Sequence, residues 1–366
     1  MAYEQISHIL PCFSFEGTFE GAKELTSGNI NHTYRVSFRL EDGSLKEYVL
    51  QKINTYVFKK PDEVMSNVQK VTAHLRKTIV DRGEDASRRA LHLIETVDGG
   101  CMVKDGENFW RAYDFITDAV AYDRVEKPEH FREAGRAFGE FQNALAAFPA
   151  AELYDTIPDF HNTKKRFFTF VQAVAEDKAG RVKELEAEID FFFDRRKMMS
   201  EIVDRIECGE IPLRVTHNDT KINNVMLDKD SGEALCVIDL DTVMPGSALY
   251  DYGDAVRFGA STAAEDEPDL GLISIDLGLF KAFTEGFVGA VRDSLTKTEI
   301  ELLPLGIKVI TCELAMRFLT DYIDGDLYFR PAYPGHNLVR ARAQMKLLTE
   351  IEQRYDQMCE MIREML

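Results

Sequence analysis

The chain of 366 residues is 45% hydrophobic and 29% charged, which is enough apolar sequence to build a core in two lobes. Its formal net charge of −19 argues against a nucleic-acid partner, because an acidic surface repels a polyanion, whereas a nucleotide with bound magnesium brings its own cation. The N-terminus lacks the pattern of a signal peptide, and no apolar run approaches the ~20 residues of a membrane helix, so we expect a cytoplasmic protein without a membrane partner.

The first part of the chain is typical of a small antiparallel sheet. Within residues 24–38, a turn of Gly and Asn separates two short strands, the second of which alternates apolar and polar side chains. A Glu-Asp-Gly-Ser turn at 41–44 leads to a returning strand at 47–53. In kinases a glycine-containing hairpin of this kind covers the nucleotide, which makes Gly28 a candidate contact. Any turn in an antiparallel sheet has the same pattern.

A helix is predicted next. Between residues 61 and 75, apolar side chains recur at spacings of four, three and four, which predicts one face of an amphipathic helix. In a kinase, Glu63 or Asn67 on this helix could pair with the side chain that contacts the nucleotide. A solvated Glu63 on an ordinary amphipathic helix fits equally well.

The best candidate for a boundary is an aromatic strand within residues 108–117, since Pro and Gly are sparse and no flexible linker is present. In a kinase this strand would lead into the hinge, where backbone groups at Tyr113 and Phe115 contact adenine. We therefore expect an N-terminal lobe at 1–115 and a C-terminal lobe at 116–366.

Beyond this strand the pattern becomes helical. Apolar residues between 131 and 148 step by three and four without a break, which predicts the buried face of a scaffold helix. Residues 183–207 form a second helical stretch with dense charge. We expect the final segment, 339–366, to close the chain as one helix.

Residues 215–227 contain the pattern His-x-Asp-x-x-x-x-Asn between two apolar segments. This is the layout of a kinase catalytic loop, in which Asp219 would receive the proton of the acceptor hydroxyl and Asn224 would bind magnesium. A hairpin follows, with a turn at 229–232, and its returning strand brings Asp239 back beside the loop.

Asp241 follows Asp239 on the same side of an extended chain. Two converging carboxylates repel each other unless a cation joins them, which indicates Mg²⁺ at both residues. We interpret His217 as a residue that packs and binds the backbone. Asp251 and Asp254 follow a Pro-Gly turn, and we expect them to bind backbone amides or an arginine.

With these motifs the chain resembles the aminoglycoside phosphotransferase and choline kinase superfamily, a branch of the protein-kinase-like fold. Within it, the likeness is greatest to the N-acetylhexosamine 1-kinase family. The resemblance covers nearly the whole chain, through residues 31–34, 48–51, 131–139, 213–221, 238–242, 244–247, 257–262, 284–289 and 336–340. It implies an α+β, bilobal fold with a small antiparallel-sheet N-lobe and a larger, mainly helical C-lobe.

The resemblance also implies roles for single residues. Asp219 corresponds to the base at the anomeric hydroxyl of the sugar, and Asn224 and Asp239 correspond to magnesium ligands. Asn31 and Thr33 lie in the nucleotide-covering motif.

The resemblance places most of the residues that would contact the acceptor later in the chain. Arg317 and Tyr328 match residues that contact the sugar, although Arg317 could equally pair with Glu313 one turn back. Asn29 stands where the closest relatives can carry a sugar-contacting His.

The strand at 47–53 departs from the pattern of the superfamily. The position of the usual nucleotide lysine holds Gln51, and alternation places Lys52 on the opposite face. Motif matching favours Gln51 and charge favours Lys52, so only one of the two would face the phosphates.

These observations predict an ATP-dependent kinase that uses Mg²⁺ to convert N-acetylglucosamine or N-acetylgalactosamine to its 1-phosphate. Two alternatives stay open. One is a kinase of the same fold that acts on another small hydroxyl acceptor, such as an amino alcohol, homoserine or an aminoglycoside. The other is a non-catalytic regulator that binds a nucleotide. The oligomeric state and the preferred sugar do not follow from the sequence.

Overall fold

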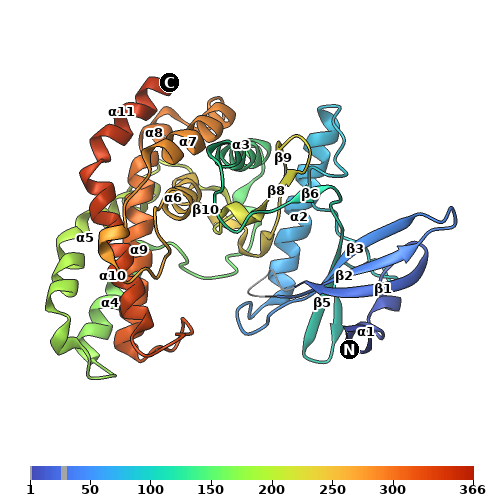
Figure 1. Cartoon of the computed structure of the whole chain (residues 1–366), viewed down its shortest axis with the longest axis horizontal. Coiled ribbons are helices and arrows are strands. Elements are labelled where there is room, and N and C mark those ends of the chain that lie inside the picture. Colours follow the sequence, from blue (N-terminus) through green and yellow to red (C-terminus); the bar gives the residue numbers. More distant parts are fainter. Residues whose placement is uncertain (1, 26–30) are drawn as a thin grey trace.

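The computed structural model describes residues 2–25 and 31–366, so the predicted contacts at Gly28 and Asn29 lie outside the described residues. The N-terminal part is an antiparallel sheet and the C-terminal part is mainly helical, which confirms the predicted fold class (Figure 1). The N-terminal sheet has the order β1-β2-β3-β5-β4, with strands β1 (Thr18–Leu25), β2 (His32–Arg39), β3 (Leu45–Lys52), β4 (Val103–Asp105) and β5 (Asn108–Asp114).

Alternating side chains give this sheet two different faces. Tyr48 and Leu50 of β3 belong to a buried apolar cluster that includes residues of α1 (Ala2–Ile6) and η1 (Leu10–Cys12). Val49 and Gln51 point to the opposite side and line a cavity.

The helix predicted at 61–75 is confirmed as α2 and extends further, over Pro61–Asp81. Its apolar face is buried, with Val64, Val68 and Val71 no more than 1% exposed. The burial of this face explains why the helical periodicity was visible in the sequence.

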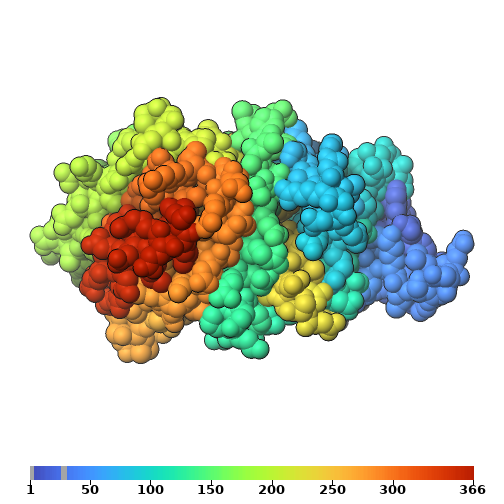
Figure 2. All heavy atoms as spheres, turned by 90° about the horizontal axis from the view of Figure 1, so that it is seen from above, coloured from blue at the N-terminus to red at the C-terminus, as the bar shows by residue number. Residues whose placement is uncertain are grey.

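The chain passes from the sheet into the C-terminal part after β5. There β6 (Ala119–Val120) pairs with β8 (Val225–Asp228), which pairs with β9 (Ala234–Val237). Seen from above, the molecule is elongated, with the blue N-terminal residues at one end and the orange and red C-terminal helices toward the other (Figure 2).

The helices of the C-terminal part are α3 (Pro128–Ala144), α4 (Thr163–Glu176), α5 (Glu186–Glu207), α6 (Ala248–Gly259), α7 (Leu277–Val291), α8 (Lys297–Glu301), α9 (Leu303–Asp324), α10 (His336–Gln353) and α11 (Tyr355–Met365). The remaining elements are η2 (Ala150–Glu152), η3 (Val182–Glu184), β7 (Arg214–Thr216), η4 (Ile222–Asn224), η5 (Leu240–Thr242), β10 (Met244–Gly246) and η6 (Leu270–Leu272). Among the described residues, none of the helices is both long and apolar enough to cross a membrane.

The predicted scaffold helix is α3, and it packs closely against α7. A Cβ atom added at Gly135 would lie 2.2 Å from the carbonyl oxygen of Phe283, and one added at Gly286 would lie 2.0 Å from that of Arg132. Glycines therefore let the two backbones approach. This contact supports the catalytic loop, because the rings of Phe138 and Phe141 on α3 pack against His217.

Two predicted helices differ from the observed ones. The segment 339–366 was expected to be one helix, but α10 ends at Gln353 and α11 begins at Tyr355. Helix α10 contacts two cores: Leu348 belongs to the cluster around α4, α5 and α9, whereas Leu347, like Met358 of α11, belongs to the cluster of α3, α6 and α7. The helical stretch predicted from residue 183 begins as η3, and α5 starts at Glu186.

Candidate active site

A cavity of about 460 Å³ lies between the N-terminal sheet and the loop that follows β7. It brings together residues that are far apart in the sequence, namely Asn31, Thr33, Gln51, Tyr113, Phe115, Asp219, Asn224 and Asp239. All of these were candidate site residues. Gln51 lines the cavity and Lys52 does not, which is what strand alternation requires of neighbouring residues.

The loop before Asp219 is held by a buried carboxylate on α6. Asp251 accepts hydrogen bonds from the backbone N–H groups of His217, at 2.8 Å, and Asn218, at 2.7 Å. The ring of His217 bonds the carbonyl oxygen of Ile238 through Nε2 at 2.8 Å. These contacts confirm the structural roles expected for Asp251 and His217.

Both oxygens of the Asp219 carboxylate have partners. Lys221 Nζ lies 2.8 Å from Oδ1, and Asn224 Nδ2 donates to Oδ2 at 3.1 Å and to the backbone carbonyl of Asp219 at 2.8 Å. Burial disfavours the charge on Lys221, but Asp219 and Asp254 outweigh it and raise the pKa of Lys221. Asp219 therefore has a fixed orientation before any substrate binds.

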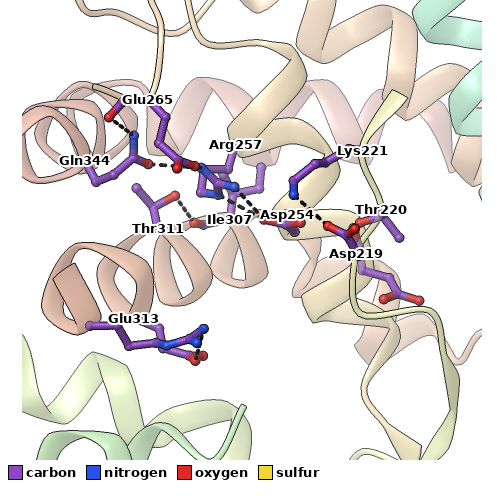
Figure 3. A network of polar contacts seen from close by, with 12 residues as sticks. Asp219, Thr220, Lys221, Asp254, Arg257, Glu265, Ile307, Thr311, Glu313 and Gln344 are labelled. Carbon is purple, nitrogen blue, oxygen red and sulfur yellow. Dashed lines mark hydrogen bonds and ion pairs between the residues drawn. The ribbon is translucent and has the colours of Figure 1, made fainter. Parts of the chain in front are cut away.

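Figure 3 shows how this pair continues into the C-terminal core. Lys221 points toward Asp219, and Asp254 lies behind it on α6. Asp254 is bonded by Arg257, at 2.8 Å from Nη2 and 3.0 Å from Nε, as expected for a carboxylate that pairs with an arginine. Arg257 also reaches Glu265 at 3.0 Å, so the network anchors α6.

Asp239 stands where β9 ends, in the left-handed backbone region with φ of 59°. Burial, followed by repulsion from Asp241 and Asp219, raises the pKa of Asp239. A carboxylate that is costly to ionise next to other carboxylates fits a cation.

The donor set fits magnesium carried by a nucleotide. Among the described residues, no three His, Cys, Asp or Glu side chains are grouped so that they could hold a metal ion by themselves. Mg²⁺ is usually held by one or two protein oxygens together with phosphates and water. Asp239 and the side-chain oxygen of Asn224, which both line the cavity, could supply the protein's part.

Asp241 lies two residues further on and has different surroundings. It is 3% exposed, and its two oxygens are bonded by Arg111 and by Asn31 Nδ2, the latter at 2.8 Å. Metal binding by Asp241 stays a prediction that would require one of these partners to move.

Arg111 is the residue that the sequence reasoning missed. It sits on β5 directly opposite Gln51 of β3, and it is 1% exposed. The signal available in the sequence was a charged residue inside an aromatic strand, Phe-Trp-Arg-Ala-Tyr, where an unpaired charge is disfavoured.

The hinge residues line the cavity as expected, but one backbone group is already used. The N–H of Phe115 donates to the carbonyl oxygen of Glu47 at 3.1 Å. Arg35 covers the ring of Phe115 at 4.5 Å from its centroid. Adenine recognition by the backbone would therefore fall to Ile116 and the residues after it.

The candidate partners on α2 do not reach the cavity. Glu63 pairs with Lys60 at 2.8 Å near the surface, as an ordinary amphipathic helix would allow. Asn67 donates to the carbonyl oxygens of Tyr154, at 2.8 Å, and Val243, at 2.9 Å.

Arg317 and Tyr328 belong to a second polar cluster, which does not line the nucleotide-sized cavity. Arg317 lies 3.8 Å from Glu313, and its guanidinium faces the rings of Phe160, Tyr328 and Phe329 at 5.4–5.6 Å. Tyr328 itself is 64% exposed.

The centre of this cluster is Glu313, a carboxylate only 1% exposed on α9. His161 Nδ1 lies 3.0 Å from one oxygen, and Arg166 lies 4.0 Å from the other, which has no hydrogen-bond partner among the described residues. Burial opposes ionisation, but His161, Arg317 and Arg166 lower the pKa of Glu313. Burial opposes ionisation of Asp254, but Arg257, Lys221 and His161 lower the pKa of Asp254.

The chain is similar to known proteins in sequence and in fold. A family model described as the phosphotransferase enzyme family matches residues 21–282. The chain is similar to the solved structure of a microcompartment-associated aminopropanol kinase, with 14% identity, a TM-score of 0.60 and coverage of 97% of this chain and 98% of that chain.

Two further solved structures are similar over most of their length. An amicoumacin kinase in complex with AMP-PNP, Ca²⁺ and Ami has 11% identity, a TM-score of 0.59 and coverage of 97% of this chain and 94% of that chain. A choline kinase from Cryptosporidium parvum Iowa II has 12% identity, a TM-score of 0.57 and coverage of 98% and 97%. At such identities these structures show a shared fold alone.

Proposed function

The chain belongs to the phosphotransferase enzyme family, and from this membership we propose that it is an ATP-dependent kinase that phosphorylates the anomeric hydroxyl of an N-acetylhexosamine. The products would be the sugar 1-phosphate and ADP. The cavity that joins Asp219, Asn224 and Asp239 to the sheet supports the nucleotide part of the proposal. A non-catalytic regulator is disfavoured, because such proteins commonly lose one of these three residues.

In the proposed reaction Asp219 orients the acceptor hydroxyl and receives its proton. Lys221 and Asn224 hold the two carboxylate oxygens, so little reorganisation is needed when the acceptor arrives. Bound magnesium would screen the charge of the transferring phosphoryl group, and Asp239 and Asn224 would hold it. The rest of the catalysis would come from positioning in the closed cavity.

The acceptor class is argued from the cluster around Glu313, which is the observation that carries this part of the proposal. Arg166 and Arg317 lie 4.0 and 3.8 Å from the same oxygen of Glu313, and burial, followed by Arg317, lowers the pKa of Arg166. A positively charged acceptor would be repelled by both. A neutral sugar can accept hydrogen bonds from arginine at its acetamido carbonyl. It can also donate a hydroxyl to the Glu313 oxygen that has ion pairs with Arg166 and Arg317 but no hydrogen bond among the described residues.

One observation favours the alternative acceptor class. The same carboxylate oxygen, which has no hydrogen bond among the described residues, could bind the ammonium group of an amino alcohol, homoserine or an aminoglycoside. The solved structures similar in fold include a kinase of aminopropanol and one of choline. The acceptor therefore has to be tested directly.

The test is a panel of acceptors incubated with ATP and Mg²⁺, with ADP release measured and the product located by phosphorus NMR. We expect turnover of N-acetylglucosamine or N-acetylgalactosamine with a phosphorus signal coupled to the anomeric proton. Turnover of an amine-bearing acceptor without any sugar 1-phosphate would overturn the sugar assignment and leave the kinase assignment intact.

A variant sharpens this test. Arg317→Met should raise the KM for the sugar by about 10- to 100-fold, the cost of lost hydrogen bonds to a charged group, and leave the KM for ATP unchanged. Arg196→Met on α5 is the matched control, because its guanidinium donates to the carbonyl oxygen of Phe193 in its own helix and to no other described residue. An unchanged sugar KM in Arg317→Met would remove this residue from the acceptor site.

A further inference from the structure

The nucleotide cavity lacks the cation arrangement that kinases use. In protein kinases a lysine on the third strand binds the phosphates and pairs with a glutamate on the neighbouring helix. Here the strand position that faces the cavity is Gln51, and α2 presents the sulfur of Met65, 3.8 Å from a guanidinium nitrogen of Arg111. Among the described residues, the cations that line the cavity are therefore Arg111 of the adjacent strand, β5, and Lys221 of the loop after β7, whereas β3 contributes none.

Arg111 uses its planar group to hold two residues at once. Nε and Nη2 donate to Oε1 of Gln51 at 3.0 and 2.9 Å, and Nη1 pairs with Oδ1 of Asp241. The guanidinium also faces the ring of Tyr113 at 5.2 Å. The side chains of Arg111 and Asp241 are 1% and 3% exposed. Water is therefore excluded from the ion pair, and the attraction between the two charges is strong.

The hydrogen bonds from Arg111 determine which way the Gln51 amide faces. Arginine only donates hydrogen bonds, so the amide oxygen must point to Arg111 and the amide nitrogen must point away from it. Nε2 donates to Oγ1 of Thr33 at 3.1 Å, which uses one of its two N–H groups. The second N–H has no hydrogen-bond partner among the described residues, and Gln51 lines the cavity.

The contact between Arg111 and Asp241 connects the N-terminal sheet to the C-terminal part. Asp241 belongs to η5 in the C-terminal part, while Arg111 and Asn31 belong to the sheet. Asn31 is itself fixed, because its Oδ1 accepts the backbone N–H of Asn54 at 3.0 Å. Asp239, two residues before Asp241, is thereby held at a set distance from the sheet.

We propose that Arg111 is a positioning residue of the nucleotide site: it directs an N–H of Gln51 toward the phosphates and fixes Asp239 against the sheet through Asp241. The proposal rests on the proposed function, since it assumes that this cavity binds MgATP. It assigns to an arginine on β5, paired with an aspartate of the C-terminal part, the work that a lysine on β3 and a helix glutamate do in protein kinases.

The test uses two conservative substitutions, of which only Arg111→Lys preserves the buried charge. Arg111→Lys keeps a cation for Asp241 but cannot hold Gln51 with the same forked geometry. Gln51→Glu keeps the contact with Arg111 but removes the N–H groups and adds a negative charge beside the phosphates. For both we expect the KM for MgATP to rise about 10-fold or more, with the KM for the acceptor unchanged.

If Arg111 and Gln51 had only a structural role, weaker MgATP binding would be accompanied by a lower melting temperature. Gln51→Glu places a carboxylate against Arg111, so the melting temperature should be equal to or higher than that of the wild type, even though MgATP binds more weakly. Arg39→Lys is the matched control, because Arg39 on β2 pairs with exposed Glu20 outside the cavity. A KM for MgATP within about twofold of the wild type in both Arg111→Lys and Gln51→Glu would overturn the proposal.

Moving the positive charge from β5 to β3 by a double substitution gives an independent check. Arg111→Met alone leaves Asp241 buried without its cation, which is expected to destabilise the fold. Adding Gln51→Lys returns a cation to the β3 position of protein kinases and should restore both the melting temperature and part of the MgATP affinity. Recovery of the melting temperature without any recovery of affinity would show that the arginine is only a structural partner.

The inference can be separated from the proposed function by calorimetric titration of the wild type with Mg²⁺ and AMP-PNP. Binding to the wild type, together with unchanged binding to Arg111→Lys and Gln51→Glu, would refute the inference alone. No binding to the wild type would refute the nucleotide site and this inference together.

Discussion

At the scale of single residues, the arrangement around Asp219 separates two tasks that carboxylates share in this cavity. Asp219 is held by Lys221 and Asn224 in one orientation, whereas Asp239 has a raised pKa and carboxylate neighbours. Asp241 is already neutralised by Arg111. Three acidic residues within a short stretch thus have three environments, which suit a base, a metal ligand and an anchor.

Substitution of Asp219 by Asn tests the first of these roles. Asparagine keeps the size of the side chain but cannot accept the proton of a hydroxyl, so we expect kcat to fall by about 10²- to 10⁴-fold. MgATP binding should change little, because Asn224 and Asp239 are intact. Turnover and AMP-PNP affinity are measured side by side, with Asp190→Asn on the exposed face of α5 as control. Full turnover in Asp219→Asn would exclude it as the base.

At the scale of elements, the β8–β9 hairpin places Asp239, and its turn is built by one carboxylate. Asp228 accepts hydrogen bonds from the backbone N–H groups of Asp230, at 3.0 Å, and Ser231, at 2.9 Å. It also bonds Arg88 at 2.9 Å, and Arg88 donates to the carbonyl oxygens of Thr117 and Asp118. The turn is therefore connected to the segment that links the sheet to the helices.

Asp228→Asn should lower the melting temperature in a manner that depends on pH. Hydrogen bonds from the N–H of Ser231, from Arg88 and from the N–H of Asp230 lower the pKa of Asp228 to about 2. A carboxyl whose folded pKa is depressed stabilises the fold fully above its unfolded pKa, near ~3.9, and loses this contribution as the pH falls toward the folded value.

The measurement is the melting temperature of wild type and Asp228→Asn across a pH series. The difference between them should be constant from neutral pH to about pH 5 and shrink as the pH falls below ~4. A difference that does not change with pH would mean that the charge of Asp228 contributes nothing to the fold.

At the scale of the whole molecule, the cavity is formed by two parts of the chain that are joined by polar contacts. Asp241 meets Arg111 and Asn31 of the sheet, and Asn67 of α2 meets the carbonyl oxygen of Val243. A nucleotide in the cavity would add contacts to both parts. Its binding is therefore expected to stabilise the folded protein as a unit.

MgATP should raise the melting temperature of the whole chain, since saturation at 100 times Kd contributes about 2.7 kcal/mol. Removal of Mg²⁺ with a chelator should abolish most of this shift.

Asp239→Asn should also abolish the shift in melting temperature caused by MgATP. Without nucleotide, however, this variant should be at least as stable as the wild type at pH 7. The raised pKa of Asp239, caused first by burial and then by Asp241 and Asp219, shows that its charge is unfavourable in the fold. A MgATP shift in Asp239→Asn equal to that of the wild type would exclude Asp239 as a metal ligand.

Local patterns in the sequence predicted the parts of the fold that depend on neighbouring residues. The strands around residues 34–38 and 47–53, the helix that became α2 and the hairpin after Asn224 all have periodicities or turns that are visible in a short window. By contrast α9 was missed, because it is buried on nearly all sides and its apolar residues show no single face. The break between α10 and α11 was missed because buried apolar residues continue across it: Ile351, Met358 and Ile362 all belong to one cluster.

What the sequence by itself determined was the spacing of the catalytic loop and the alternation that makes Gln51 and Lys52 face opposite sides, since both follow from backbone geometry over a few residues. Only the tertiary structure decided that Arg111 and Asn31 meet Asp241, from 130 and 210 positions away. No local rule relates such distant residues, because their contact depends on how the sheet packs against the helical part. The same packing places Asp239 at the cavity, where we propose that it binds a metal, and makes Asp241 join the two parts of the molecule.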